Sequence, residues 1–243
     1  MFTKAHPSRM PDSLQRSLGC FIQFWPLDRT VVKSVTNLST ELTTIDDLET
    51  IYAQLDAGNT GIIQCSKFKR LSVGYSVTMK PLCWATKLID DSLELINCCK
   101  QLTKGLCYLK TNKILHRDLR WNNVVYDKQT ESYFIIDLEH AALDKGTAIH
   151  VSSKFRSNLP INLMKQVGQL YEYNYATEVA SFGLMIDHIL KINDSYTTLY
   201  RRLEFRTKSL KDSLEFRLLS LLRDLSLRDD ETQRPSIEQL NMM

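Results

Sequence analysis

The sequence predicts an α+β fold built from two lobes, and two observations lead to that prediction. About the first 80 residues are rich in short strand-like runs, whereas the chain beyond residue 92 carries apolar stripes at helical spacing. A strand-rich part followed by a helical part is typical of the α+β class rather than of an alternating α/β sheet. The chain has 243 residues, 43% of them hydrophobic, which is enough to bury a core in one domain or in two small lobes.

The strand-rich part follows a polar N-terminal segment. Residues 1–18 are polar and include two prolines, so we expect this segment to be poorly ordered. Strand-like runs follow at residues 21–25 and 30–35, and residues 26–29 between them are typical of a hairpin turn.

A helix is expected next, over residues 45–55, because apolar residues recur there at a spacing of 3.6 residues. Asp46 and Asp47 would lie in its first turn, where negative charge is favourable. Further strands are expected at residues 62–63 and along the alternating run 72–79.

The helical part begins with a long apolar stripe over residues 95–109. Two strands joined by a polar turn are expected after it, at 124–126 and 133–136. Residues 138–172 show little periodicity and predict an irregular segment. Two buried helices complete the chain, with apolar stripes over residues 179–190 and 216–225.

The composition narrows the expected partners and compartment. The net charge is +3 and no long run of one sign occurs, so neither a nucleic acid nor an anionic membrane is an expected partner. The N-terminus lacks the apolar core of a secretory signal, and no stretch approaches the roughly 20 apolar residues that span a bilayer. The six cysteines form no C-x-x-C pair and sit in apolar segments. They predict free thiols and a cytoplasmic or nuclear location, without a zinc site.

One stretch carries the strongest chemical signal of the chain. Residues 116–123 read His-Arg-Asp-Leu-Arg-Trp-Asn-Asn and lie between two apolar runs. This spacing matches the H-R-D-L-x-x-x-N catalytic loop of kinases, in which the Asp receives a hydroxyl proton and the Asn holds a metal ion. We therefore predict Asp118 as the catalytic base and Asn123 as a metal ligand. The alternative interpretation is a charged surface turn between a helix and a strand.

Phosphoryl transfer also needs a second metal ligand and a cation for the phosphates. Asp137 ends the apolar strand one hairpin after Asn123, so we predict it as that ligand; a turn-forming Asp is the alternative. Lys33 ends a Val-Val-Lys run that matches the V-A-I-K pattern of a phosphate-binding lysine; a solvated strand lysine is the alternative. Glu49 is predicted to pair with Lys33, ahead of Glu41, because it lies beside apolar helix positions where a carboxylate needs a partner.

The phosphate cradle is the part for which the sequence offers least. A G-x-G-x-x-G loop would precede Lys33 but is missing, and only Gly19 stands near the required place. Fewer glycines allow a less close approach of the backbone to phosphates. We therefore expect Gly19 to be the remaining cradle position and the first strand of the sheet to be missing.

Taken together, these positions resemble the eukaryotic protein-kinase-like family from about Gly19 to Leu240. Two later landmarks support the resemblance. Glu178-Val-Ala-Ser-Phe-Gly183 is similar to the family's D-x-W-S-F-G, and Arg234-Pro-Ser is similar to the R-P-S that precedes its last helix. In the family, that arginine pairs with the carboxylate of an A-P-E motif, which is not visible here.

The resemblance implies a bilobal protein-kinase-like fold with a small β-rich N-lobe at 19–79 and a mainly helical C-lobe at 85–240. Between them it implies a hinge at 79–84 that holds adenine, beginning at Met79. It also implies ATP and Mg²⁺ as cofactors and a protein substrate, with serine or threonine hydroxyls ahead of tyrosine. Arg120 stands where the family often has a lysine near the γ-phosphate, which implies a catalytic role. The oligomeric state stays open.

The sequence departs from the family at the D-F-G motif, which reads Asp137-Leu138-Glu139 here. Leucine keeps an apolar plug, whereas glutamate removes a flexible glycine and adds a carboxylate near the metals. The string Ile-Ile-Asp-Leu-Glu-His-Ala also resembles the I-D-W-E-x-A of aminoglycoside and choline phosphotransferases. The mixture resembles divergent fungal and oomycete kinase-like proteins, including Crinkler-type effectors. Three functions stay open: a protein kinase, a kinase-fold binding module (pseudokinase) without turnover, and a small-molecule phosphotransferase.

Overall fold

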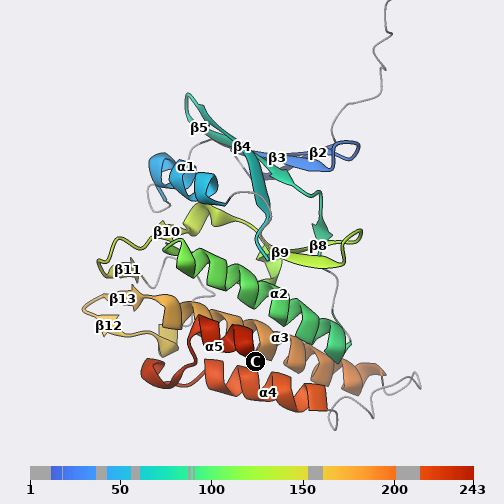
Figure 1. Ribbon diagram of the computed structural model, residues 1–243, viewed down its shortest axis with the longest axis vertical. Helices are drawn as coiled ribbons and strands as arrows, with labels where there is room; N and C mark the ends of the chain where they lie inside the picture. Colours follow the sequence, from blue (N-terminus) through green and yellow to red (C-terminus); the bar gives the residue numbers. More distant parts are fainter. Residues whose placement is uncertain are drawn as a thin grey trace, which may run out of the picture.

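The computed structural model describes residues 12–17, 19–36, 43–55, 61–86, 89, 91–152, 161–200 and 214–243. Figure 1 shows a strand-rich upper lobe and a helical lower lobe, which confirms the α+β, bilobal fold expected from the sequence. A single cluster of buried apolar side chains extends from the sheet of the upper lobe to the long helices of the lower lobe. The two lobes therefore share one continuous core.

The strand-rich lobe is a five-stranded antiparallel sheet with one helix packed against it. Its strands are β1 (Asp12–Ser17), β2 (Cys20–Trp25), β3 (Thr30–Thr36), β4 (Gln64–Leu71) and β5 (Gly74–Lys80), in the order β1-β2-β3-β5-β4. Helix α1 (Ile45–Gln54) packs on β4. Thr44 caps α1 by accepting a hydrogen bond of 3.1 Å from the Asp47 N–H. The predicted hairpin at 26–29 and the predicted helix are both confirmed.

Two strands of this sheet differ from the sequence prediction. Residues 12–17, which the sequence places in a poorly ordered segment, form β1, so the first strand of the sheet is present rather than missing. The predicted strand at 62–63 is replaced by β4, and Ile62 makes only an isolated bridge to Ile135. Both β1 and β4 are edge strands. An edge strand is held by backbone hydrogen bonds to one neighbouring strand. It therefore need not show the alternating apolar pattern by which a half-buried strand is predicted from sequence.

The described part of the helical lobe contains four α-helices, which lie around the lower half of the core. They are α2 (Ser92–Thr111), α3 (Tyr175–Tyr200), α4 (Leu214–Ser226) and α5 (Ile237–Met242). Two glycines bring backbones close together. A Cβ at Gly183 of α3 would lie 2.7 Å from the side chain of Ser226, and one at Gly105 of α2 would lie 2.6 Å from the carbonyl oxygen of Gly61. Larger residues at either position would push these elements apart.

Three small sheets complete this lobe. One contains β6 (Trp84–Ala85), β8 (Val124–Asp127) and β9 (Ser132–Ile135); one pairs β7 (Ile114–Leu115) with β10 (Ala142–Leu143); and one contains β11 (Ile149–Ser152), β12 (Gln166–Val167) and β13 (Leu170–Tyr173). The strands predicted at 124–126 and 133–136 are confirmed as β8 and β9. The segment 138–172, predicted to be irregular, contains four strands in its described part, and each is too short to show a periodic pattern.

The cysteines are all free thiols, as the sequence predicts. Within the described ranges, no helix combines the length and the apolar character needed to cross a bilayer.

Candidate active site

In the loop between β7 and β8, two of the predicted residues, Asn123 and Arg120, contact the carboxylate of a third, Asp118. The side chain of Asp118 is fully buried, and its Oδ2 accepts a hydrogen bond of 2.7 Å from the Nδ2 of Asn123. The same Nδ2 donates to the Asp118 carbonyl at 2.8 Å, which leaves the amide oxygen of Asn123 as its group for a metal ion. The Nε of Arg120 lies 3.3 Å from Asp118 Oδ1. One carboxylate oxygen therefore faces a cation and the other an amide.

Two buried side chains hold this loop in place. The Nδ1 of His116 accepts a hydrogen bond of 3.2 Å from the Asp118 N–H, so its Nε2 carries the proton and donates to the Ile136 carbonyl at 3.0 Å. Glu178, in the first turn of α3, accepts from the Arg117 N–H at 2.9 Å, and burial raises the pKa of this glutamate. Arg117 has a φ of +62°, a left-handed conformation that non-glycine residues rarely adopt. These bonds therefore maintain a strained backbone beside Asp118, the predicted catalytic base.

Asp137 lies directly after β9, beside the catalytic loop. The Ile136 N–H donates to the Asn123 carbonyl at 2.9 Å, which places the two predicted metal ligands on neighbouring segments. Asp137 is also left-handed, with φ 71° and ψ 71°. Among the described residues, no group of three His, Cys, Asp or Glu side chains could hold a metal ion. One carboxylate and one amide oxygen suit Mg²⁺, which binds few protein oxygens and completes its shell with water and phosphate.

Lys33 of β3 reaches Asp137 and the carboxylate two residues beyond it. Its Nζ lies 3.0 Å from Asp137 Oδ1 and 2.5 Å from Glu139 Oε1. Tyr75 of β5 donates its hydroxyl hydrogen to the same Glu139 oxygen at 2.9 Å. Burial acts to lower the pKa of Lys33, but the charges of the two carboxylates outweigh it and raise this pKa above its usual range. Burial acts to raise the pKa of Asp137, but the charge of Lys33 outweighs it and holds this pKa below its usual range.

Glu49 does not pair with Lys33, so that prediction is wrong. The Nε of Arg70 on β4 donates to Glu49 at 2.6 Å, and the glutamate side chain is 46% exposed. The buried face of α1 consists of Leu48, Ile51 and Tyr52. Glu49 lies one position round the helix from this face, where it can point outward to β4. Glu41, the competing choice, lies outside the described residues.

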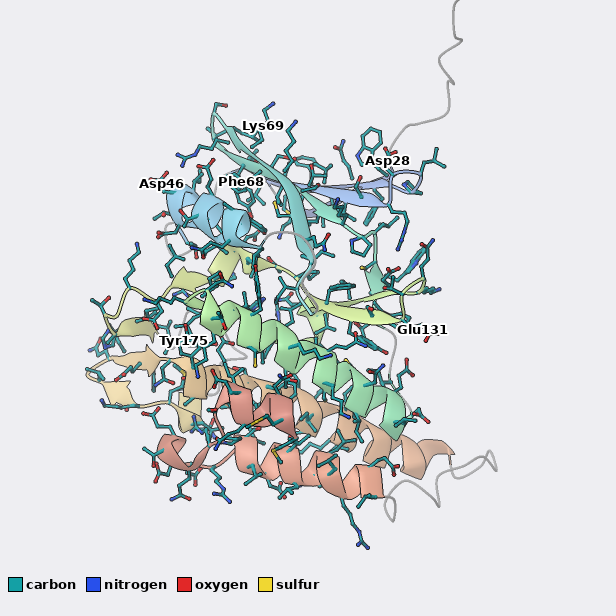
Figure 2. All side chains as sticks on the ribbon, viewed as in Figure 1. Asp28, Asp46, Phe68, Lys69, Glu131 and Tyr175 are labelled. Atoms are coloured by element: carbon teal, nitrogen blue, oxygen red, sulfur yellow. The ribbon has the colours of Figure 1, made fainter. Side chains whose placement is uncertain are left out.

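A second acidic residue of α1, Asp46, also lies on the outside of the lobe (Figure 2). Asp46, labelled at the start of α1, lies on the outer edge of the strand-rich lobe, and like Glu49 it pairs with Arg70. Phe68, labelled beside α1, stacks on Tyr75 with ring centres 5.4 Å apart. The aromatic pair fills the space between α1 and the sheet, so the acidic side chains of α1 face away from it.

Gly19 forms the turn between β1 and β2, with a φ of +91°. Its carbonyl accepts from the Thr36 N–H at 2.6 Å, and a Cβ on it would lie 2.4 Å from the Thr36 carbonyl oxygen. Glycine is therefore required here by the turn and by close packing on the end of β3. Lys33 lies on the same strand, about 10 Å along it from Thr36. Gly19 therefore lies beside the end of the strand that carries Lys33, but its backbone packs against Thr36.

Met79 lies near the end of β5 and is buried in the sheet, at the start of the predicted hinge. In that hinge the Leu82 N–H donates to the Arg29 carbonyl at 2.7 Å. The guanidinium of Arg29 reaches Asp127 of β8 at 2.6 Å. The turn between β2 and β3 is therefore tied both to the hinge and to the helical lobe.

A cavity of about 720 Å³ is lined by residues of both lobes, among them Arg29, Pro81, Lys100 and Asp127. None of the predicted catalytic or metal-binding side chains lines it. It is therefore separate from the cluster of Lys33, Asp118, Asn123 and Asp137, although the Arg29–Asp127 contact borders it.

Arg234 has no carboxylate of an A-P-E motif to pair with, and the structure shows what replaces it. Its guanidinium is buried and donates to four backbone carbonyls at 2.6–3.2 Å. These belong to Leu163, Ala176, Arg228 and Asp229. Burial lowers the pKa of Arg234, although nearby acidic residues oppose this effect. The arginine thus ties the segment before β12 to the start of α3 and to the end of the chain.

The sequence did not assign roles to three residues at this site. Glu139 holds Lys33, Tyr75 holds Glu139, and the Thr43 N–H donates to the Glu139 carbonyl at 3.3 Å. The role of Glu139 could have been predicted from the sequence, because a carboxylate two residues after Asp137 lies close enough to contact the same lysine. Tyr75 and Thr43 carried none, since both are ordinary residues for a strand and a helix start.

Comparison with known proteins finds a family whose matched range contains most of these residues. A family model described as protein tyrosine and serine/threonine kinase matches residues 86–241, which is more than half of the chain. The matched range includes the catalytic loop, Asp137 and Arg234, and it begins after the strand that carries Lys33. A search of curated proteins finds no match to the chain.

Proposed function

The chain belongs to the protein tyrosine and serine/threonine kinase family, and we propose that it transfers the γ-phosphoryl group of ATP, with Mg²⁺, to a hydroxyl group of a protein. One observation supports this most: Lys33 contacts Asp137 at 3.0 Å, and Asp137 follows a residue bonded to Asn123, which holds Asp118. Groups from separate segments therefore meet as phosphoryl transfer requires. We propose serine or threonine as the acceptor ahead of tyrosine. The free cysteines support a cytoplasmic or nuclear location.

Each residue has a distinct role in this proposal. The amide oxygen of Asn123 and the carboxylate of Asp137 would hold Mg²⁺, which neutralises charge on the phosphates when it is bound. Lys33 places a cation against the phosphates. Asp118 orients the acceptor hydroxyl and receives its proton, and its bond to Asn123 limits rotation of the carboxylate. Arg120, beside Asp118, offsets negative charge on the group in transfer.

A second function, a binding module that lacks turnover, is favoured by one specific observation. Lys33 already has two carboxylate partners, and the turn near it has a single glycine that packs on protein. Phosphates would then have to compete for the lysine without a backbone cradle. A third function, transfer to a small molecule, rests on the Asp-Leu-Glu string after β9.

A thermal-shift titration separates the first two functions. Wild-type protein with ATP and Mg²⁺ should melt at a higher temperature, because a ligand at about 100 times its Kd stabilises the folded state by about 2.7 kcal/mol. The rise should shrink when Mg²⁺ is chelated, and it should be lost in Asp137→Asn. A wild-type melting temperature that ignores ATP and Mg²⁺ would contradict nucleotide binding.

Turnover is tested with the Asp118→Asn variant. Wild-type protein should hydrolyse or transfer the γ-phosphate, and the variant should be slower by about a hundredfold or more while still binding ATP. Phosphoamino-acid analysis of labelled protein acceptors then identifies the hydroxyl, and parallel assays with aminoglycosides and choline test the third function. If wild type and variant are equally inactive with every acceptor, the binding-module function is the better one.

A further inference from the structure

We propose that Glu139 positions Lys33 for the nucleotide phosphates, so that the lysine is set by the segment after β9 and not by helix α1. This inference rests on the proposed nucleotide-binding function. It assigns a positioning role to the residue at which the chain departs most from the family pattern.

The contact itself is close and shielded from solvent. Lys33 Nζ lies 2.5 Å from Glu139 Oε1, and the two side chains are 10% and 16% exposed. A buried cation and a buried carboxylate each need a partner, and removing one leaves the other uncompensated. The Tyr75 hydroxyl donates to the same oxygen at 2.9 Å, which fixes the direction from which the carboxylate meets the lysine.

Helix α1 offers no competing carboxylate. Its three acidic residues are each engaged elsewhere: Asp46 and Glu49 with Arg70, and Asp47 with Lys145. Asp46 is 80% exposed and Glu49 46% exposed, so both lie toward solvent. The helix therefore contributes packing to this lobe and no charge to the lysine.

The charge balance at the lysine supports the same inference. Lys33 meets two carboxylates, Asp137 at 3.0 Å and Glu139 at 2.5 Å. If Asp137 holds Mg²⁺, Glu139 stays behind as the partner that keeps Lys33 extended toward the site. Both carboxylates lie on one short turn, Leu138–His140 with Asp137 before it. Asp137, the proposed metal ligand, and Glu139, the partner of Lys33, are therefore held on the same short turn.

The segment that carries Glu139 is itself anchored. The Thr43 N–H donates to the Glu139 carbonyl at 3.3 Å, and the Thr43 hydroxyl donates to the Ala141 carbonyl. The guanidinium of Arg117 donates to the His140 carbonyl. Three successive carbonyls are therefore bonded, so the glutamate side chain starts from a fixed backbone.

The opposite role for Glu139, a lock that keeps phosphates away from Lys33, makes the opposite prediction. If Glu139 positions the lysine, Glu139→Gln should raise the Kd for Mg-ADP by about tenfold or more, as expected for the loss of one charge-assisted hydrogen bond. If Glu139 blocks the lysine, the same variant should bind Mg-ADP more tightly. Isothermal titration calorimetry on the full chain decides between the two.

Glu49→Gln is the matched control, because it makes the same chemical change on α1. We expect it to alter the Kd for Mg-ADP by less than about twofold, since Glu49 pairs with the exposed Arg70 and not with Lys33 in the described part of the chain. Tyr75→Phe should weaken Mg-ADP binding by less than Glu139→Gln, because it removes support for the glutamate and keeps its charge. A large loss in Glu49→Gln with none in Glu139→Gln would overturn the proposal.

A second measurement tests the pair without any nucleotide. In a double-mutant cycle followed by urea unfolding, Lys33→Met and Glu139→Gln should be strongly non-additive, whereas Lys33→Met and Glu49→Gln should add. If a Lys33→Met variant does not fold, Lys33→Gln takes its place in both cycles. If the effects of Lys33→Met and Glu139→Gln on the free energy of unfolding are non-additive but wild type does not bind Mg-ADP, the proposed function is wrong and the Lys33–Glu139 contact is supported. If the two effects add, the contact itself is contradicted.

Discussion

Arg29 and Asp127 join the two lobes beside the hinge, with Arg29 Nη2 2.6 Å from Asp127 Oδ1. Asp127 also accepts hydrogen bonds from the Gln129 N–H at 3.1 Å and the Thr130 hydroxyl at 2.8 Å. Burial acts to raise the pKa of Asp127, but the bonds from Thr130, Gln129 and Arg29 outweigh it and hold this pKa below its usual range. The carboxylate is therefore more stable as an anion in the folded chain than in the unfolded one.

The stabilisation by Asp127 should depend on pH in a defined direction. Because its pKa is lower in the folded chain than in the unfolded one, the contribution is present above the unfolded pKa and is lost as pH falls through the folded pKa. Asp127→Asn should lower the free energy of unfolding by about 1–3 kcal/mol near pH 7. Urea unfolding at about pH 7 and about pH 3 should show this difference narrowing at the lower pH.

The exposed pair of Asp47 and Lys145 is the control for that measurement, since Asp47→Asn should change stability by less than about 1 kcal/mol. A difference between wild type and Asp127→Asn that stays equal at both pH values would contradict the assigned role of the carboxylate.

Gly19 should tolerate alanine worse than another left-handed glycine does. Gly19→Ala incurs the left-handed strain of about 1–2 kcal/mol and also a Cβ contact with the Thr36 carbonyl. Gly146→Ala has a φ of +76° but meets nothing within 4 Å, so it incurs the strain alone. Thermal unfolding of the two variants should therefore rank Gly19→Ala lower. Equal melting temperatures would mean that β1 and β2 do not meet β3 as described.

Arg234 should be a stability residue rather than a charge partner. Arg234→Ala leaves four backbone carbonyls without this donor, one in a buried contact and three in partly buried ones, and we expect a loss of about 3 kcal/mol in the free energy of unfolding. The exposed Arg228→Ala, whose side chain makes one long bond of 3.4 Å, should cost less than about 0.5 kcal/mol. Denaturant unfolding compares the two, and a similar small loss in both would refute the role of the carbonyl cluster.

The contacts within the loop of residues 116–123 can be predicted from the sequence because their geometry is local. Asp118 and Asn123 lie five residues apart, and a single turn brings their side chains to 2.7 Å. Asp137 is predictable for a related reason, since one hairpin of paired strands returns the chain to Asn123. Spacing along the chain translates directly into distance at these positions.

The partner of Lys33 could not be read in the same way. Glu49 and Glu139 lie 16 and 106 residues from the lysine along the chain, so the choice between them depends on how α1 packs on the sheet. Glu49 lies next to Leu48 in sequence yet on a different side of the helix. The edge strand β1 was missed because backbone pairing needs no apolar pattern.

Gly61 approaches Gly105 closely at the junction of the two lobes, where a Cβ on Gly61 would lie 2.2 Å from the Gln101 carbonyl oxygen. The Ile135 N–H donates to the Gly61 carbonyl at 2.8 Å, and the Ile63 N–H donates to the Ile135 carbonyl at 3.1 Å. Ile135 lies two residues before Asp137 along the chain. A larger side chain at Gly61 or Gly105 would therefore be expected to shift Asp137 relative to Lys33, although it lies outside the candidate site itself.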